Sequence, residues 1–264
     1  MPLARKRFGQ HFLNQPAIAE RIVARAGLNA DSVVLEIGPG RGSLTRLLAP
    51  RCRRLLLVEV DRDLADRLRA DFAGQPSVEV IVGDVLRIDL AQLVANERVT
   101  VVSNLPYNIS TPVMMQLLQY PELFDRLVLM LQREVAERIC APSGGKEYGA
   151  LSVVVQVVAD AHIAFRVPPT AFTPQPKVES AVITIEPRLP TPLSDSERRM
   201  LRHVVRTAFS RRRKQLANVI APLTSDPRAV LAGLGFDPQR RPETLTPAEF
   251  VRLAGALSID TDDD

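Results

Sequence analysis

Cysteine, histidine and long apolar runs are scarce in this 264-residue chain, and each shortage excludes a class of protein. The two cysteines, Cys52 and Cys140, show neither a pairing pattern nor metal-ligand spacing, so we expect free thiols rather than disulfides or a zinc site. The three histidines are scattered and predict no metal site. No apolar stretch approaches the length of a membrane span, and the basic residues 1–7 lead into no secretory segment. These absences favour a cytosolic protein without a metal.

Positive charge is unevenly distributed along the chain, whose net charge is +4. Residues 188–259 hold 13 Lys and Arg against 6 Asp and Glu, whereas residues 1–187 hold 21 against 20, and residues 260–264 hold four Asp. Such an excess predicts a nucleic-acid-binding surface, although a solvated arginine-rich helix face would give the same composition. The candidate binding residues are Arg202, Arg206, Arg211, Arg212, Arg213 and Lys214.

Short apolar runs alternate with helical patterns in the first half of the chain. The runs are residues 33–37, 55–58, 78–82 and 99–102. This alternation predicts an α/β fold with a doubly wound sheet, preceded by a helix over 15–25 that Asn14 would cap. Each run is followed by glycine or a polar side chain, namely the loop 38–42, Glu59, Asp84 and Asn104. Because the carboxyl ends of parallel strands meet at one edge of a sheet, we expect these groups to form one cleft.

The loop after the first predicted strand has the pattern E-x-G-x-G-x-G over residues 36–42. Gly38 and Gly40 allow the backbone to turn sharply and to approach a ligand closely. Glu59 follows about twenty residues after the first glycine, where an acidic side chain can bind both ribose hydroxyls. A nicotinamide-binding loop would read G-x-G-x-x-G, so the pattern favours a methyltransferase, with a doubly wound fold for another nucleotide as the alternative.

The tetrad Asn104-Leu105-Pro106-Tyr107 follows the fourth predicted strand. The Asn104 side-chain oxygen and the Leu105 carbonyl can both accept hydrogen bonds from the exocyclic amine of a base on which Tyr107 stacks. Two acceptors on one amine draw its nitrogen towards a tetrahedral geometry, so that its lone pair can attack a carbon. An Asn-x-Pro-Tyr tetrad is typical of enzymes that methylate amino nitrogens with S-adenosylmethionine. The alternative interpretation is a strand end turned by Pro106.

Leucine in the tetrad, the following residues 108–112 and the Phe-Gly-Gln-x-Phe-Leu segment at residues 8–13 together resemble one family. The chain is similar to the ribosomal RNA adenine dimethyltransferases, in particular the bacterial enzymes that act on small-subunit rRNA. The resemblance implies a class I S-adenosylmethionine-dependent methyltransferase fold, a Rossmann-like doubly wound sheet. The cofactor-binding residues that it implies are His11, Leu13, Gly38, Gly40, Glu59, Asp84, Val85 and Asn104.

Four prolines lie in the segment 168–178, between predicted closing strands at 162–167 and 181–185, one of them antiparallel. The prolines make this loop stiff and exclude it from a sheet. By resemblance to the family, Phe172 lies across the cleft from Tyr107 and closes the other face of the target base. A hydrophobic plug between the loop and the core is the alternative for Phe172.

The last third of the chain reads as helical after a proline-containing linker at 189–193. Helical patterns cover residues 195–209, 211–221, 229–234 and 247–257, and by resemblance the apolar run 148–153 also begins a helix. We therefore expect three parts. They are a catalytic S-adenosylmethionine-binding domain (1–188), a small all-helical, basic RNA-binding domain (189–259) and an acidic tail (260–264).

The expected activity is S-adenosylmethionine-dependent dimethylation of two adjacent adenines in small-subunit rRNA, with a role in ribosome biogenesis. We expect a monomer whose partner is this rRNA or a precursor particle. One alternative is a large-subunit rRNA methyltransferase of the macrolide-resistance type. A DNA adenine or protein glutamine methyltransferase would usually carry proline in place of Leu105. A non-catalytic ribosome-assembly factor is the last alternative, and the intact Glu59, Asp84 and Asn104 argue against it.

Overall fold

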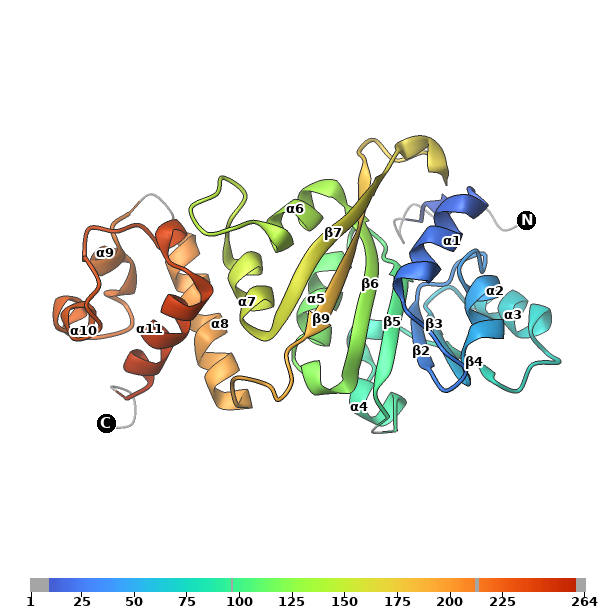
Figure 1. Ribbon diagram of the computed structural model, residues 1–264, viewed down its shortest axis with the longest axis horizontal. Coiled ribbons are helices and arrows are strands. Elements are labelled where there is room, and N and C mark those ends of the chain that lie inside the picture. Colours follow the sequence, from blue (N-terminus) through green and yellow to red (C-terminus); the bar gives the residue numbers. More distant parts are fainter. Residues whose placement is uncertain (1–9, 96, 212–213, 260–264) are drawn as a thin grey trace. The chain divides into compact units, whose positions relative to one another are not determined.

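The computed structural model describes residues 10–95, 97–211 and 214–259, which divide into two compact units (Figure 1). One unit is Met1–Ala136 with Ala161–Pro187, and the other is Glu137–Asp160 with Arg188–Asp264. The structural units therefore differ from the expected domains, because residues 137–160 group with the C-terminal residues. The division at residue 188 into a catalytic and an RNA-binding domain stays a prediction. Within the described residues, no helix has both the length and the apolar character needed to cross a membrane.

A seven-stranded sheet lies in the first unit, in the order β4-β3-β2-β5-β6-β9-β7. Its strands are β2 (Val33–Ile37), β3 (Arg54–Glu59), β4 (Val78–Val82), β5 (Val99–Asn104), β6 (Phe124–Gln132), β7 (Ala159–Val167) and β9 (Ser180–Pro187). β2 to β6 pair in parallel, and β9 runs antiparallel to β6. Every residue of β2 is buried, as continuous apolar runs in parallel sheets require. The doubly wound sheet and its antiparallel closing strand are thereby confirmed.

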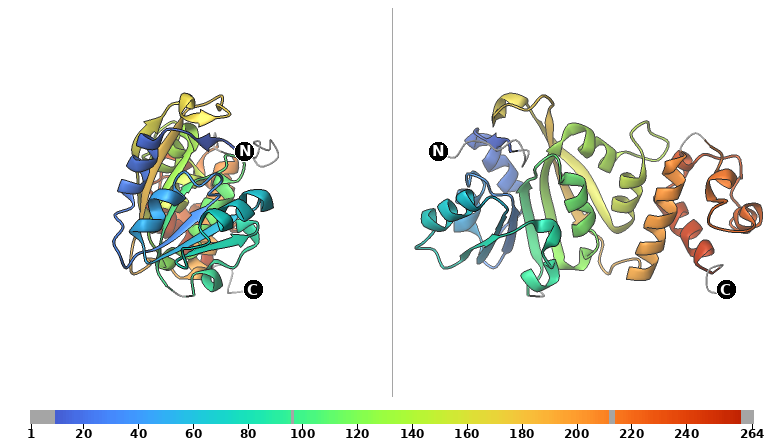
Figure 2. Two further views of the ribbon diagram at one scale, coloured as in Figure 1. Left: turned by 90° about the vertical axis from the view of Figure 1, so that its right-hand side faces the viewer. Right: turned by 180° about the vertical axis from the view of Figure 1, so that it is seen from behind.

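Helices cover both faces of this sheet (Figures 1 and 2). α1 (Pro16–Arg25), α2 (Thr45–Leu48) and α3 (Arg62–Asp71) contribute buried apolar side chains to a common core on one face. α4 (Leu90–Leu93) and α5 (Ser110–Leu117) lie on the other face. This layering leaves the carboxyl ends of the parallel strands as the edge at which a ligand can bind.

A second, two-stranded sheet joins the N-terminal arm, described from Gln10 to Gln15, to the proline-rich loop at 168–178. β1 (Phe12–Leu13) pairs antiparallel with β8 (Phe172–Thr173). The prediction that this loop holds no strand was wrong, because the residues between its prolines retain their N–H groups. The predicted cap was also wrong: α1 begins at Pro16 without a side-chain cap, and Asn14 Nδ2 donates instead to Thr173 Oγ1 at 2.8 Å.

The second unit is helical. The boundary between the units falls within α6 (Arg133–Cys140), after Ala136. The other helices of the second unit are α7 (Ala150–Val158), α8 (Asp195–Ser210), α9 (Leu216–Ile220), α10 (Pro227–Gly233) and α11 (Pro247–Ile259). α7 packs against α8 and α11, which is why residues 137–160 group with the C-terminal part. The helix implied for the apolar run at 148–153 is confirmed from Ala150 onwards. Short 3-10 helices occupy Ala49–Arg51, Val85–Arg87, Pro121–Leu123, Pro169–Ala171 and Pro242–Thr244.

An ion pair fixes the start of α11 in the second unit. The Arg240 guanidinium donates to both carboxylate oxygens of Glu249, at 2.6 and 3.1 Å, and the Thr246 N–H donates to the same carboxylate at 2.7 Å. These hydrogen bonds, with Arg240 as the largest cause, hold the pKa of Glu249 at about 2, below its usual value of 4.5. The ionised carboxylate therefore stabilises the fold above pH 4.5, and this contribution is lost as the pH falls towards 2.

We predict that Glu249→Gln lowers the free energy of unfolding by about 1–2 kcal/mol at pH 7, because it removes a bidentate, partly buried charge pair. The difference from the wild type should shrink as the pH falls below 4. Urea unfolding between pH 7 and pH 3 measures it, with the exposed Glu122→Gln as the matched control. A difference that stays constant over this range would contradict the assignment.

Candidate active site

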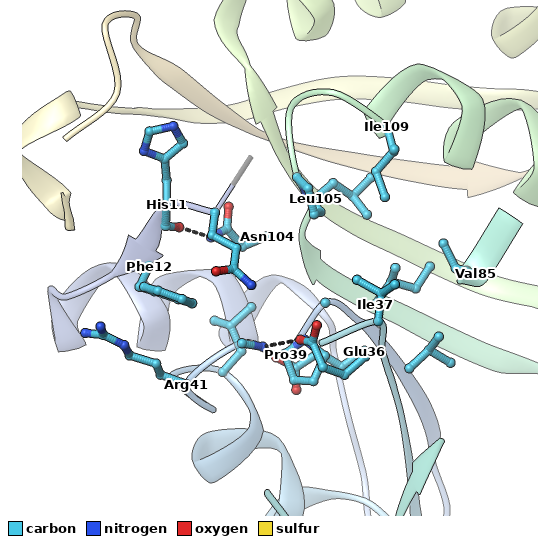
Figure 3. Close-up of a pocket in the computed structure, with 18 of the residues that line it drawn as sticks. His11, Phe12, Glu36, Ile37, Pro39, Arg41, Val85, Asn104, Leu105 and Ile109 are labelled. Atoms are coloured by element: carbon cyan, nitrogen blue, oxygen red, sulfur yellow. Dashed lines mark hydrogen bonds between the residues drawn. The ribbon is translucent and has the colours of Figure 1, made fainter. Parts of the chain in front are cut away.

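A pocket of about 210 Å³ lies at the carboxyl ends of β2, β3, β4 and β5 (Figure 3). The loop after β2, the ends of β3 and β4, the tetrad after β5 and the N-terminal arm all contribute to its lining. The structure therefore brings together the predicted residues His11, Leu13, Gly38, Gly40, Glu59, Asp84, Val85, Asn104, Leu105, Pro106 and Tyr107. Polar groups from four separate strand ends meet at one edge, as the alternating pattern predicts.

Three glycines of the loop 38–42 lie in the left-handed region, and two of them, Gly38 and Gly40, line the pocket. Gly38 has φ +66° and Gly40 has φ +59°, conformations that side chains disfavour. A Cβ on Gly40 would lie 3.1 Å from the Phe12 ring, so the arm can approach the loop closely only because that position is glycine. The Gly40 N–H donates to Glu59 Oε2 at 3.0 Å, which ties the loop to the end of the neighbouring strand.

Two buried carboxyl groups lie beneath this loop. Glu36 is 2% exposed and accepts a hydrogen bond from Thr45 Oγ1 at 2.7 Å, and burial raises the pKa of Glu36 to about 8. Burial also raises the pKa of Glu59, although the N–H groups of Asp61 and Gly40 oppose this. The sequence analysis assigned no role to Glu36, whose only signal was its place as the first letter of the glycine pattern. Because burial favours the neutral form of both groups, a positively charged ligand bound nearby would lower their pKa values and favour ionisation.

The end of β4 supplies the far wall of the pocket. Val85 is buried, and Asp84 is half-buried. Asp84 Oδ1 accepts the Leu86 N–H at 3.0 Å and so caps the short 3-10 helix that follows. Its second oxygen lies 3.9 Å from the exposed Arg87 guanidinium. A carboxylate oxygen accepts more than one hydrogen bond, so the cap leaves Asp84 able to bind a ligand amine.

The tetrad begins where β5 ends, and the arm fixes its first side chain. Asn104 Nδ2 donates to the His11 main-chain carbonyl at 3.0 Å (Figure 3). With the donor end of the amide bound to the arm, Oδ1 is the atom that can accept a hydrogen bond from a ligand amine. Leu105 is buried, and its N–H donates to the Met130 carbonyl at 3.2 Å, which anchors the turn to β6.

The N-terminal arm lies across the pocket and is held at several points. Ser43 Oγ donates to the Leu13 carbonyl at 2.8 Å, and the Arg41 guanidinium lies 4.3 Å from the centre of the Phe12 ring. The His11 ring stacks on Tyr107, and its Nδ1 is hydrogen-bonded to the Pro174 carbonyl at 2.7 Å. Residues 10–13 are therefore part of the pocket wall.

The two predicted base-stacking rings differ in their surroundings. Tyr107 lines the pocket, and its hydroxyl is hydrogen-bonded to Ser180 Oγ at 2.6 Å, while burial raises the pKa of that hydroxyl. Phe172 is 3% exposed, belongs to the apolar core with Leu13 and does not line the pocket. This burial agrees with the alternative interpretation of Phe172 as a hydrophobic plug. A stacking role would require this side chain to leave the core.

The structure describes four of the predicted nucleic-acid-binding residues, and all four belong to the second unit. Arg206, Arg211 and Lys214 are exposed. Arg202 is partly buried, and burial with the neighbouring guanidinium charges lowers its pKa. The sequence analysis also predicted Arg212 and Arg213, which lie outside the described residues.

Arg198, on the same helix, does not belong to an exposed basic face. It is 6% exposed, donates to the Leu193 carbonyl at 2.8 Å and forms an ion pair with Asp195. Asp195 lies one helical turn before Arg198, at the i, i+3 spacing that brings two side chains together on a helix. The described residues contain no group of three or more His, Cys, Asp or Glu that could hold a metal ion.

Comparisons with known proteins agree with this geometry. A profile of the family described as ribosomal RNA adenine dimethylase matches residues 1–257. Ribosomal RNA small subunit methyltransferase A of Syntrophotalea carbinolica is 44% identical over 253 residues, which cover 95% of each chain. The protein of the same name from Geobacter metallireducens is 43% identical over 262 residues, covering 96% of this chain and 95% of the relative.

Solved structures give the same result. A dimethyladenosine transferase from Plasmodium falciparum superposes with a TM-score of 0.83 at 26% identity, covering 95% of this chain and 98% of the other. The 23S rRNA methyltransferase ErmE superposes with a TM-score of 0.72 at 25% identity, covering 94% and 99%. The chain therefore belongs to the ribosomal RNA adenine dimethylase family and is an S-adenosylmethionine-dependent methyltransferase.

Proposed function

We propose that this enzyme dimethylates the exocyclic amino groups of two adjacent adenines in small-subunit rRNA. The observation that carries the proposal is the orientation of Asn104: its amide nitrogen is bound to the His11 carbonyl, which leaves Oδ1 as an acceptor in the pocket. An adenine amine needs such an acceptor, and the neighbouring Leu105 carbonyl can supply a second one.

The residues of the pocket fit S-adenosylmethionine, which when bound supplies a methyl group on a positively charged sulfur. The pocket that would hold the cofactor is lined by residues at the carboxyl ends of β2, β3, β4 and β5. Glu59 would accept hydrogen bonds from the ribose hydroxyls, and Asp84 from the adenine amine beside Val85. The arm residues His11 and Leu13 would cover the methionine end.

The chain's own part in the reaction is positioning and exclusion of water. Asn104 Oδ1 and the Leu105 carbonyl orient the target amine, and Tyr107 holds the ring that bears it. Such positioning is worth several kcal/mol, on the order of 7–11 at most. The methylated amine is acidic while it is cationic and can release its proton to water, so no general base is required. A paired base cannot reach this pocket, so the target adenine is single-stranded or flipped out.

The relatives support small-subunit rRNA over the alternatives. Several bacterial relatives at 42–44% identity carry the name ribosomal RNA small subunit methyltransferase A, whereas the large-subunit enzyme ErmE is 25% identical. We infer that the partner is small-subunit rRNA or its precursor particle, that the protein acts in the cytoplasm as a monomer, and that it contributes to ribosome biogenesis. Mass spectrometry of small-subunit rRNA from cells with and without the protein tests this, since dimethyladenine should disappear with the protein.

Asn104→Ala should reduce turnover by about 100-fold or more, because the acceptor that orients the amine is lost. The affinity for S-adenosylmethionine should change by less than about tenfold. Asn104→Asp is the matched variant, since it keeps acceptor oxygens but cannot donate to the His11 carbonyl, and we expect it to be impaired as well. Single-turnover methylation and calorimetric cofactor binding measure both variants. Normal methylation by Asn104→Ala would contradict the proposal.

Replacing residues 211–214 with alanine should weaken RNA binding and flatten its dependence on salt. If each of the four basic side chains contacts a phosphate, the slope of log K against log salt should fall in magnitude by about three. Filter binding from 50 to 300 mM salt measures this slope, and circular dichroism checks the fold. An unchanged slope would mean that these four side chains do not contact phosphate.

Glu36→Gln should change how the stability of the cofactor-free enzyme depends on pH. The unfolded chain releases the Glu36 proton near pH 4.5, whereas the folded chain keeps it until about pH 8, so ionisation opposes folding across this window. The variant should therefore gain about 3–4 kcal/mol relative to the wild type between pH 5 and pH 8, since each pH unit in this window contributes about 1.4 kcal/mol. Chemical unfolding at these two pH values measures the gain, and a difference independent of pH would contradict it.

A further inference from the structure

The His11 ring contacts two segments of the site that lie far apart in the sequence. The ring stacks on Tyr107, with 5.3 Å between the ring centres and 28° between the ring planes. Its Nδ1 lies 2.7 Å from the Pro174 carbonyl, to which it donates. One side chain therefore contacts both the tetrad and the proline-rich loop, while its carbonyl holds Asn104.

Tyr107 has a second anchor, but that anchor cannot set the plane of its ring. The hydroxyl is hydrogen-bonded to Ser180, a fully buried residue at the start of β9, at 2.6 Å. The hydroxyl oxygen lies on the axis about which a tyrosine ring rotates. A hydrogen bond at that point fixes the position of the hydroxyl end of the ring. It does not restrict rotation of the ring about this axis, since terminal sp³–sp² torsions are broad. A contact on the ring face does restrain the plane, and His11 provides such a contact.

The loop that His11 contacts is itself fixed to the arm. The Asn14 N–H donates to the Ala171 carbonyl at 2.9 Å, and Asn14 Nδ2 donates to Thr173 Oγ1 at 2.8 Å. With these bonds in place on one side, the contact between His11 and Pro174 holds the imidazole at a defined position above Tyr107. The orientation of the Tyr107 ring thus depends on the positions of both the arm and the proline-rich loop.

We propose that the His11 side chain is a positioning residue that sets the plane of Tyr107 for stacking on the target adenine. The inference rests on the proposed function of Tyr107 as the stacking ring. Because His11 covers one face of Tyr107, the adenine takes the opposite face. His11 thereby takes on part of the restraint that the family resemblance assigned to Phe172, which is buried in the core.

His11→Ala should lower kcat/KM for RNA by roughly tenfold, the effect expected from losing one ring contact and one hydrogen bond. The affinity for S-adenosylmethionine should change by less than about twofold, because the His11 ring contacts Tyr107 and the Pro174 carbonyl. Two further variants separate the two interactions. His11→Phe keeps a flat ring on Tyr107 without the donor, and His11→Asn keeps a donor without the ring. We expect His11→Phe to retain more activity than His11→Asn.

A double-mutant cycle of His11 and Tyr107 distinguishes a positioning role of His11 from a general loss of stability. In a Tyr107→Ala background, His11→Ala should cause no further loss, since the ring that it orients is absent. The exposed His162→Ala, in β7 of the same unit, is the matched control and should behave as wild type. Thermal unfolding of every variant checks the fold.

Three results would overturn the inference. The first is unchanged RNA kinetics in His11→Ala. The second is faster methylation by this variant, which would mean that the His11 ring blocks the position of the target base. The third is a fall in cofactor affinity as large as the fall in kcat/KM. Asn104→Ala in the same assay keeps the two proposals apart. If Asn104→Ala is inactive while His11→Ala is normal, only the His11 inference fails, whereas active Asn104→Ala removes the proposed function.

Discussion

The site depends on the hydrogen bond between the Asn104 amide and the main-chain carbonyl of His11. A carboxamide has a donor end and an acceptor end, and either could face a ligand. Binding of the donor end by the arm leaves the acceptor end in the pocket, where an amine requires it. The segment that covers the cofactor region and the side chain that orients the substrate therefore form one hydrogen-bonded unit. Loss of arm order would affect both sites together.

The edge of the sheet was predictable because its signals are local. β2 and β4 begin and end at the predicted residues, since each is an apolar run bounded by a turn. The glycine pattern, Glu59, Asp84 and Asn104 follow strands directly, and parallel strands bring such positions to one edge.

Other features were not predictable, because they depend on contacts between segments far apart in the sequence. The pairing of β1 with β8, the burial of Phe172 and the bond from Tyr107 to Ser180 each join residues more than 70 positions apart. No periodicity or motif in the sequence indicates such contacts. The membership of residues 137–160 in the second unit has the same origin, since it follows from the packing of α7 on α8 and α11. The raised pKa of Glu36 likewise reflects burial by the whole fold.

A crystal structure with an unreactive S-adenosylmethionine analogue and adenosine tests the central claim most directly. We predict that Asn104 Nδ2 remains on the His11 carbonyl while Oδ1 lies within hydrogen-bonding distance of the adenine amine. We also predict that the analogue's ribose lies at Glu59. An amide turned the other way, or adenosine bound away from Asn104 with the pocket beneath Gly38 empty, would contradict the account.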